Sequence, residues 1–275
     1  MNTHQETTLI LGGTGKTGRR VAERLRARQH SVRIGSRSGA QRFDWHDQNT
    51  WAPVLEGAGA MYIAYPPDLA VPTSGPHLRA MAEQAVASGV RKIVLLSGRG
   101  EPRCHPAERA VLESGAAFTL LRCAWFAQNF SEGQLLSSVL EGELAFPAGD
   151  VAEPFVDIDD TADVAVAALT SDAHDGKLYE LSGRRLLTFH DAVTEIGRAI
   201  GRDIRYVPIS SDDYAKVLSQ FVPDDQVAFL KELFESVLDG HNAYLSDGVQ
   251  QALGREPKDF RDFVRDAVAS GVWQP

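Results

Sequence analysis

Short runs of apolar residues alternate, in the first half of the chain, with stretches in which apolar residues recur every three or four positions. The runs predict buried strands, and the spacing of Leu78, Met81 and Ala85 predicts an amphipathic helix. The expected strands are Thr7–Leu11, Ser31–Gly35, Ala60–Tyr65, Lys92–Ser97 and Phe118–Arg122. Because strands that alternate with helices form a parallel sheet covered on both faces, we expect an α/β protein with a doubly wound parallel sheet.

The pattern loosens after about Glu143. Short strands are expected at Leu144–Pro147, Glu153–Ile158 and Lys177–Leu181, around a helix at Thr161–Leu169. Helices are then expected at Phe189–Ile200, Asp212–Leu218, Asp224–Leu238 and Asp259–Ala269. The sequence therefore predicts a sheet domain over residues 1–150 and a smaller region over 151–275, interwoven with the sheet over 151–182 and mostly helical from 183.

Composition narrows the functional classes. The 275 residues include 28 Lys and Arg and 37 Asp and Glu, a net charge of −9, which argues against a nucleic-acid binder because phosphate neutralisation needs clustered positive charge. No run of about 18 apolar residues predicts a membrane span, and the polar segment Met1 to Thr7 lacks the apolar core of a secretion signal. Cys104 and Cys123 are too few for a disulfide framework. We expect a cytoplasmic protein that binds neither nucleic acid nor membrane, and we leave a homodimer open.

A glycine-rich turn joins the first expected strand to a helix over Thr17–Arg28. A phosphate needs close backbone approach, free N–H groups and the positive end of a helix dipole, and such a turn supplies all three. Its residues, taken as candidate cofactor ligands, are Gly12, Gly13, Thr14, Gly15, Lys16, Thr17 and Gly18. The spacing is G-x-x-G-x-x-G, and it lacks the G-K-[ST] ending of a nucleoside-triphosphate loop. We therefore predict a Rossmann-type domain that binds a dinucleotide.

Charge at the second strand selects the dinucleotide. An NAD site places a carboxylate there for the ribose hydroxyl, whereas an NADP site places an arginine. No acidic residue lies between Glu23 and Asp44, and the strand runs into Ser36 and Arg37, which can bind the 2′-phosphate. Asp44-Trp45, after a possible short strand at Arg42–Phe43, can meet the adenine, although Trp45 can equally be a packing residue. These residues predict NADP(H) as the cofactor and no metal.

An ordered series of motifs runs through nearly the whole chain. It begins with Gly12–Gly18, Ser36-Arg37, Arg91–Ser97, Glu108, Val111, Ser114-Gly115, Thr119, Leu121-Arg122, Trp125-Phe126 and Asn129-Phe130. It continues with Val156-Asp157, Asp160–Ala165, Ala252–Pro257, Phe260, Phe263 and Trp273. The series resembles the NmrA-like branch of the atypical short-chain dehydrogenase/reductases, and most closely the members that reduce quinones with NADPH.

The sequence departs from the wider family at its catalytic pair. Ordinary members carry Tyr-x-x-x-Lys, but counting back from Glu108 places Gly100 at the tyrosine position and Cys104 at the lysine position. An alcohol or ketone reaction needs that proton donor. Hydride addition to a quinone instead yields an oxygen whose conjugate acid has a pKa of about 10. Two options stay open: hydride transfer to an acceptor that manages its own charge, or cofactor binding without turnover.

The remaining candidates follow the carboxyl ends of the strands, where such sheets bind ligands. Tyr65-Pro66-Pro67 either stiffens the loop under the cofactor or forms a plain turn. Ser97 is a candidate catalytic hydrogen-bond donor to the nicotinamide or the substrate, or else a residue that closes a strand. His105 is a candidate proton source, or else a loop residue before Pro106.

Aromatic residues after the expected strand Phe118–Arg122 are the substrate candidates. By resemblance, Trp125, Phe126 and Asn129 line the nicotinamide end, with Asn129 bonding the carboxamide, and Phe155 walls an aromatic substrate. The carboxylates of Asp157, Asp159, Asp160 and Asp163 are not expected to bind a metal, because Asp160-Thr161 is expected to cap the following helix with Asp163 on its first turn. The apolar C-terminal helices are expected to be mostly core, with a minority able to close over a flat ligand.

The hypothesis is an NADPH-dependent oxidoreductase that transfers a hydride to a small planar acceptor, quinone-like or aromatic polyketide-like, without a Tyr–Lys dyad. An alternative is the reductive step of a flavin- and metal-free, oxygen-dependent hydroxylation of an aromatic natural product, a monooxygenase-type reaction in polyketide biosynthesis. A further alternative is a regulatory protein that senses NADP(H) without catalysis.

Overall fold

The computed structural model describes residues 6–274, so most of the polar N-terminal segment and Pro275 lie outside the described residues. The chain divides into two compact units. Unit 1 comprises the described residues up to Cys123, Ile158–Leu181 and Gly248–Arg255. Unit 2 comprises Ala124–Asp157, Ser182–Asp247 and the residues from Glu256 onward. The sequence placed a boundary at residue 150 and expected residues 151–182 to be interwoven with the sheet; the chain passes between the two units five times.

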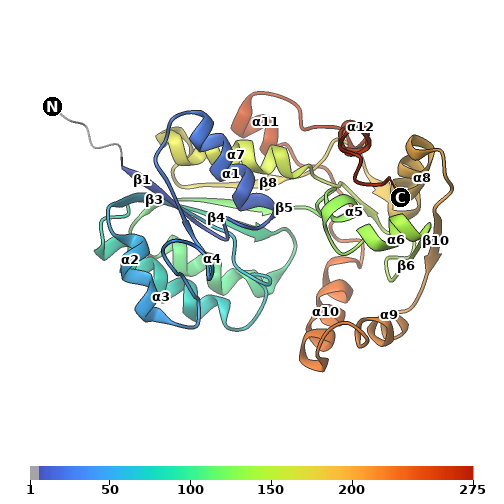
Figure 1. The fold of residues 1–275 in the computed structure, drawn as a ribbon, viewed down its shortest axis with the longest axis horizontal. Helices are drawn as coiled ribbons and strands as arrows, with labels where there is room; N and C mark the ends of the chain where they lie inside the picture. The colour runs from blue at the N-terminus through green and yellow to red at the C-terminus, as the bar shows by residue number, and fades with distance from the viewer. Residues whose placement is uncertain (1–5, 275) are drawn as a thin grey trace. The chain divides into compact units, whose positions relative to one another are not determined.

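Unit 1 is a six-stranded parallel sheet with helices on both faces, as the sequence predicted (Figure 1). Its strands, in spatial order, are β2 (Val32–Gly35), β1 (Thr7–Leu11), β3 (Ala58–Ile63), β4 (Lys92–Gly98), β5 (Ala117–Cys123) and β8 (Lys177–Leu181). One face carries α1 (Lys16–Ala27) and α7 (Ile158–Thr170), with α11 (Gly248–Leu253) packed on α7 and β8. The other face carries α2 (Trp51–Leu55), α3 (Ser74–Ala87) and α4 (His105–Leu112).

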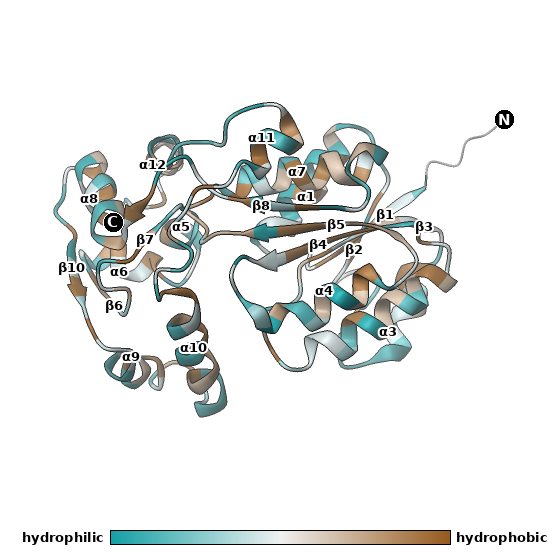
Figure 2. Cartoon of the chain, turned by 180° about the vertical axis from the view of Figure 1, so that it is seen from behind, coloured by the Kyte–Doolittle hydropathy of each residue, from teal (hydrophilic) through white to brown (hydrophobic). Residues whose placement is uncertain are grey.

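The strands form because their side chains are apolar on both faces of the sheet. Leu9, Ile10 and Leu11 of β1 are fully buried, as are Ile93, Val94 and Leu95 of β4. Figure 2 shows the same pattern as brown colour along the central strands. A strand covered by helices on both sides needs no polar face, so the continuous apolar runs of the sequence are explained.

The strand order reverses at β1, and sheets of this kind bind ligands at the carboxyl ends of the strands at such a point, here β1 and β3. The chain first adds β2 on one side of β1 and then β3 on the other side. The helices that follow these strands therefore cover opposite faces of the sheet. The strand expected at Arg42–Phe43 is reduced to a single parallel bridge between Ser36 and Arg42. Because the chain turns back after β2 and only one residue pairs, this edge of the sheet stays short.

Helices α1 and α7 are joined by charge pairs that correct the expected cap. Asp160 does not cap the helix: α7 begins at Ile158, so Asp160 lies inside its first turn, fully buried. Its carboxylate pairs with Arg255 at 2.6 Å. Arg24 of α1 pairs with Asp159 at 2.7 Å and with Asp163 at 2.8 Å. Arginines therefore neutralise the acidic run of α7.

Unit 2 contains short helices and two small sheets. Its helices are α5 (Asn129–Glu132), α6 (Leu136–Glu141), α8 (Phe189–Ile200), α9 (Ser211–Leu218), α10 (Asp224–Val237) and α12 (Phe260–Ser270). Strand β6 (Glu143–Phe146) pairs in parallel with β10 (Arg205–Pro208), and β7 (Ala152–Glu153) pairs antiparallel with β9 (Leu187–Thr188). The expected strand Glu153–Ile158 is wrong beyond its first residue. Val156 makes only an isolated bridge to Phe126, and Ile158 already starts α7.

Aromatic rings fill the core of unit 2. Phe130 lies 5.4 Å from Phe155 and 5.9 Å from Phe260, measured between ring centroids, and Phe146 lies 4.9 Å from Phe189. Such edge-on and tilted pairs add to the burial of apolar area. Within residues 6–274, no helix is long and apolar enough to cross a bilayer.

Candidate functional site

The glycine turn of unit 1 leaves room only for glycine at key positions. Gly12 has a φ of +80°, and a Cβ there would lie 2.5 Å from the carbonyl oxygen of Ala64. A Cβ on Gly18 would lie 2.3 Å from the carbonyl oxygen of Gly12. The turn is therefore packed tightly between the end of β3 and the start of α1.

The helix after the turn begins without a side-chain cap. Gly15 is the N-cap residue of α1 and supplies no capping hydrogen bond, and the first turn contains no acidic residue. Thr14 and Gly15 are exposed, whereas Thr17 is buried. An uncapped helix N-terminus on an exposed glycine turn fits the pyrophosphate of a dinucleotide, because its N–H groups and dipole both favour an anion.

A tight turn after β2 presents Arg37. The Gly39 N–H donates to the carbonyl of Ser36 at 3.3 Å, and the Phe43 N–H donates to the same carbonyl at 2.9 Å. Arg37 is exposed within this turn. Asp44 lies nearby: the pKa of its carboxyl is below the usual range, chiefly because the His46 backbone N–H donates to it, and the charges of Arg42 and Arg37 lower it further. Arg37 is thus fixed at the carboxyl end of β2 with its side chain open to solvent.

Trp45 belongs to an aromatic cluster. The cluster comprises Phe43, Trp45, Trp51, Tyr65 and His77. Trp45 is 6% exposed, its ring centroid is 4.8 Å from that of Tyr65, and it stacks on His77 at 6.2 Å. Packing therefore uses most of the Trp45 ring, and an adenine contact by Asp44 or Trp45 stays a prediction.

Tyr65 is held by a histidine that the sequence analysis missed. Its hydroxyl lies 2.6 Å from Nδ1 of His77 on α3. Burial raises the pKa of Tyr65 and lowers that of His77, so both are neutral near pH 7. The loop Tyr65-Pro66-Pro67 is therefore anchored from α3 through Tyr65, and its stiffening role and the plain-turn alternative both stay predictions. Its contact with the cofactor stays a prediction.

Ser97 lies in a buried polar cluster with Glu108 and Arg122. The Ser97 hydroxyl donates to Glu108 Oε1 at 2.7 Å, and Arg122 donates to both carboxylate oxygens, at 2.9 and 2.6 Å. Burial pushes the pKa of Glu108 upward, but the hydrogen bonds from Arg122 and Ser97 outweigh it and hold the pKa below its usual range. Since the single hydroxyl proton of Ser97 is given to Glu108, Ser97 can accept a hydrogen bond from a ligand but has no proton left to donate.

Gly100 and Cys104 are the positions that the sequence analysis assigns to the Tyr–Lys pair of ordinary family members, and the loss of that pair stays a prediction. Gly100 has a φ of +72°, and Cys104 is buried, with its thiol pKa raised to about 12 by that burial. A neutral buried thiol cannot replace an ammonium group. His105 is the first residue of α4 and exposed, so it is a helix residue and not the expected loop residue, and its role as a proton source stays a prediction.

The candidate substrate residues all lie in unit 2. The Trp125 ring packs against Phe146 at 5.8 Å and Phe189 at 5.5 Å, and its Nε1 atom is buried without a hydrogen-bond partner among the described residues. Phe126 is half-buried, and Asn129 starts α5 and is nearly buried. Phe155 is 3% exposed within the core of unit 2. Contacts of these residues with cofactor or substrate stay predictions.

The acidic residues are arranged as partners of basic groups. Within the described chain, no group of three or more His, Cys, Asp or Glu side chains is placed to hold a metal ion. Asp157 accepts a hydrogen bond from Gln128 at 2.7 Å, and α7 presents its carboxylates to arginines. Salt-bridge geometry thus accounts for the acidic run.

Known proteins resemble the chain along its length. It is 32% identical to an agroclavine dehydrogenase of Claviceps fusiformis over 289 residues, covering 97% of this chain and 98% of that protein. The chain belongs to the NmrA-like branch of the atypical short-chain dehydrogenase/reductases. Within this branch it is an NAD(P)H-dependent oxidoreductase, as the sequence predicted. An uncharacterized oxidoreductase of Bacillus subtilis, YesF, is 30% identical and matches 98% of this chain and 97% of its own.

Solved structures share the fold. A crystal structure of an NADPH-dependent quinone oxidoreductase from Escherichia coli, complexed with NADPH, superposes with a TM-score of 0.80 at 22% identity, covering 95% of this chain and 99% of that one. No family model matches the sequence.

Proposed function

We propose that this oxidoreductase uses NADPH to reduce a planar, quinone-like aromatic acceptor, and that it does so without a Tyr–Lys dyad. The observation that carries the proposal is the pairing of an uncapped glycine turn with an exposed arginine at the adjacent strand end. Gly12–Gly18 would hold the pyrophosphate, and Ser36 with Arg37 the 2′-phosphate. The relatives named agroclavine dehydrogenase and quinone oxidoreductase support reduction chemistry of this kind.

The bound cofactor supplies a hydride, and the chain supplies binding and orientation. The geometry of unit 1 fits this group, because glycine at positions 12 and 18 lets the turn pack tightly against the protein's own backbone and leaves an exposed, uncapped helix N-terminus that favours an anion. Ser97 can accept a hydrogen bond from the carboxamide while Glu108 keeps its hydroxyl proton. By resemblance, Trp125, Phe126 and Asn129 are the residues that face the nicotinamide and the acceptor.

Proton demand separates acceptor classes. Reduction of a ketone leaves an oxygen whose conjugate acid is about as weak as water, so this oxygen needs a proton as it forms. Reduction of a quinone leaves an oxygen whose conjugate acid has a pKa of about 10, so this oxygen can stay negatively charged much more easily. Gly100 and Cys104 stand in the predicted dyad positions and the Cys104 thiol is neutral, so neither residue replaces the proton donor that ketone reduction needs. Quinone reduction does not need such a donor.

The test of the acceptor is NADPH oxidation in the presence of naphthoquinone and anthraquinone, with simple ketones as controls. Oxidation with the quinones and not with the ketones supports the proposal. Tight NADPH binding without turnover on either class overturns it in favour of a sensor. Oxygen uptake that requires NADPH and the aromatic compound together identifies the monooxygenase-type reaction of a natural-product pathway.

Arg37 tests the cofactor assignment. Arg37→Asp removes a charge-assisted hydrogen bond to phosphate and adds a repelling carboxylate, so NADPH affinity should fall about 100-fold while NADH affinity changes less than about threefold. Arg109→Asp, an exposed arginine on α4, is the matched control and should alter neither affinity. Equal losses for NADPH and NADH in Arg37→Asp would contradict the assignment of the 2′-phosphate.

A further inference from the structure

A groove runs between α8 and α12 of unit 2 and belongs to none of the residues assigned above. Its volume is about 500 Å³, which lies in the ~300–1,000 Å³ range of small-molecule sites. Its lining residues are Glu195, Arg198, Ala199, Arg261, Val264, Arg265 and Val268. They recur at intervals of three and four residues, so each helix contributes one face to the groove.

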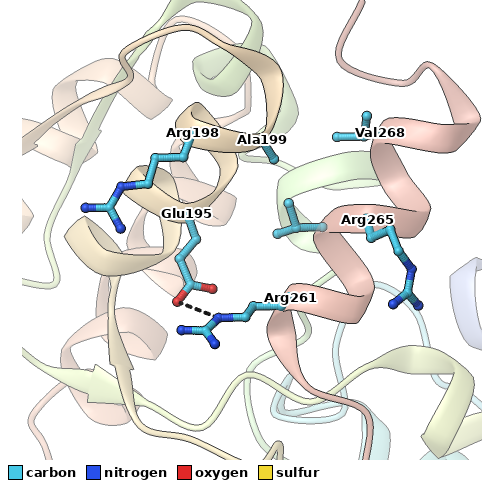
Figure 3. Close-up of a pocket in the computed structure, with 7 residues that line it drawn as sticks. Glu195, Arg198, Ala199, Arg261, Arg265 and Val268 are labelled. Carbon is cyan, nitrogen blue, oxygen red and sulfur yellow. Dashed lines mark ion pairs between the residues drawn. The ribbon is translucent and has the colours of Figure 1, made fainter.

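The middle of the groove is apolar and its edges are basic. Figure 3 shows Ala199 and Val268 facing each other across it, while Arg261 reaches from α12 toward Glu195 on α8. The ends of Arg198 and Arg265 point outward on either side. Arginine stems are hydrocarbon with a charged end, so these side chains can extend the apolar walls and still place charge at the rim.

The carboxylate in the groove is already neutralised. Glu195 accepts two hydrogen bonds from Arg185, at 2.8 and 3.0 Å, and Arg185 also binds Asp259. Arg261 approaches Glu195 only to 3.9 Å. Glu195 is thus fixed in place by Arg185, which leaves the guanidinium of Arg261 without a close hydrogen-bonded carboxylate among the described residues.

The arginines of the rim differ in their partners. Arg265 pairs with Asp262 at 2.7 Å and with Asp266 at 3.2 Å, so its positive charge is already paired with two carboxylates. Arg198 has no ion pair within the described chain, and it lies on the exposed surface of α8. Arg198, without an ion pair in the described chain, and Arg261, whose ion pair with Glu195 spans 3.9 Å, are therefore the two cations of the groove least engaged by carboxylates, one from each helix.

We propose that this groove binds an amphipathic anion, a hydrocarbon chain that ends in a carboxylate or a phosphate. The hydrocarbon lies along Ala199, Val264 and Val268, and the anionic head is bound by Arg198 and Arg261. The two guanidiniums can each donate two parallel hydrogen bonds to such a head. This site is independent of the proposed reaction, because none of its residues serves the glycine turn or the strand ends of unit 1.

Calorimetry on the full chain, without NADPH, tests the proposal with dodecanoate and dodecyl phosphate as probes and dodecanol as an uncharged control of the same chain length. We expect saturable one-to-one binding of the anions and binding of dodecanol at least about tenfold weaker. In the double variant Arg198→Gln/Arg261→Gln the affinity for the preferred anion should fall about tenfold or more. The matched double variant Arg28→Gln/Arg109→Gln, which removes two exposed arginines of unit 1, should bind as the wild type does.

The probes also distinguish a carboxylate head group from a phosphate head group, and they test whether something other than an anion occupies the groove. Preference for dodecanoate indicates a fatty-acid-like ligand, and preference for dodecyl phosphate indicates a phosphate ester. Val268→Thr keeps the volume of the side chain and should weaken both anions, because it places a hydroxyl on the apolar floor. The proposal is overturned if neither anion binds saturably, if both double variants bind alike, or if the groove is instead covered in a concentration-dependent dimer that excludes the probes.

Discussion

Replacing Glu108 by glutamine tests whether the cluster of Ser97, Glu108 and Arg122 holds α4 against the sheet. Glu108 is 4% exposed and accepts three side-chain hydrogen bonds between 2.6 and 2.9 Å. Breaking a buried ion pair by removing one charge costs about 3–5 kcal/mol. Arg122 is 25% exposed, so water solvates part of the guanidinium that is left behind, and glutamine keeps one acceptor. We therefore expect Glu108→Gln to lower the free energy of unfolding by about 2–4 kcal/mol at pH 7.

The same change predicts a pH dependence with a definite sign. The pKa of Glu108 is lowered in the folded protein, while the unfolded chain has its ordinary value of about 4.3. A lowered pKa means that the stabilisation is fully present above about pH 4.3 and is lost as the pH falls through the folded value. The difference between wild type and Glu108→Gln should therefore shrink as the pH is lowered below about 4.

Urea unfolding followed by circular dichroism at pH 7 and at pH 3.5 measures both effects. Glu113→Gln is the matched control, because Glu113 pairs with Arg79 at 3.1 Å with both side chains about half exposed, and such pairs contribute less than about 1 kcal/mol. If Glu108→Gln and Glu113→Gln destabilise equally, or if the Glu108 effect grows in acid, the reasoning about this cluster is refuted.

Three further changes probe other parts of the molecule. Gly12→Ala should abolish NADPH binding, because the new Cβ would lie 2.5 Å from a backbone oxygen. The control Gly57→Ala, also at positive φ but with open space around it, should lower the free energy of unfolding by only about 1 kcal/mol and leave NADPH titrations unchanged. Similar titrations for both variants would disprove the crowding argument. Arg255→Ala leaves the buried Asp160 carboxylate without this partner and should lower the free energy of unfolding in urea by about 2 kcal/mol. This is less than for a fully buried pair because Arg255 is 41% exposed, and no change would mean that the pair does not stabilise the fold. Trp125→Phe keeps an aromatic ring but removes the unpartnered indole N–H. The kcat/KM for quinones should then fall about tenfold while the affinity for NADPH is unchanged. An unaltered kcat/KM would show that Trp125 does not contact the acceptor.

Local sequence patterns were enough to predict the first strand of unit 1 and the glycine turn that follows it. The strand Thr7–Leu11 matches β1 residue for residue, and the glycine turn precedes a helix as expected. Such features depend on neighbours in sequence: apolar runs make strands, and glycine permits the turn. Arg37 could be placed at a strand end for the same reason.

Contacts between distant segments were not predictable in this way. Glu108 and Arg122 were recognised as parts of a motif, but their pairing with Ser97 requires β4 and β5 to lie side by side under α4. The strand register that places Ser97 opposite Arg122 is a property of the assembled sheet. The start of α7 at Ile158 was missed because a run of aspartates reads as a cap, whereas arginines from other helices neutralise these residues within the helix. His77 carried no local signal at all.

The alternation of the two units along the chain has a consequence for synthesis. Edge strand β8 and helix α11 belong to unit 1, yet they are translated only at residues 177–181 and 248–253. A ribosome that adds about 5–20 residues per second needs roughly 13–50 s to reach Arg255. Until β8 is made, β5 has one unpaired side, and until Arg255 is made, Asp160 of α7 lacks that partner. A premature stop anywhere before Arg255 therefore leaves neither unit complete.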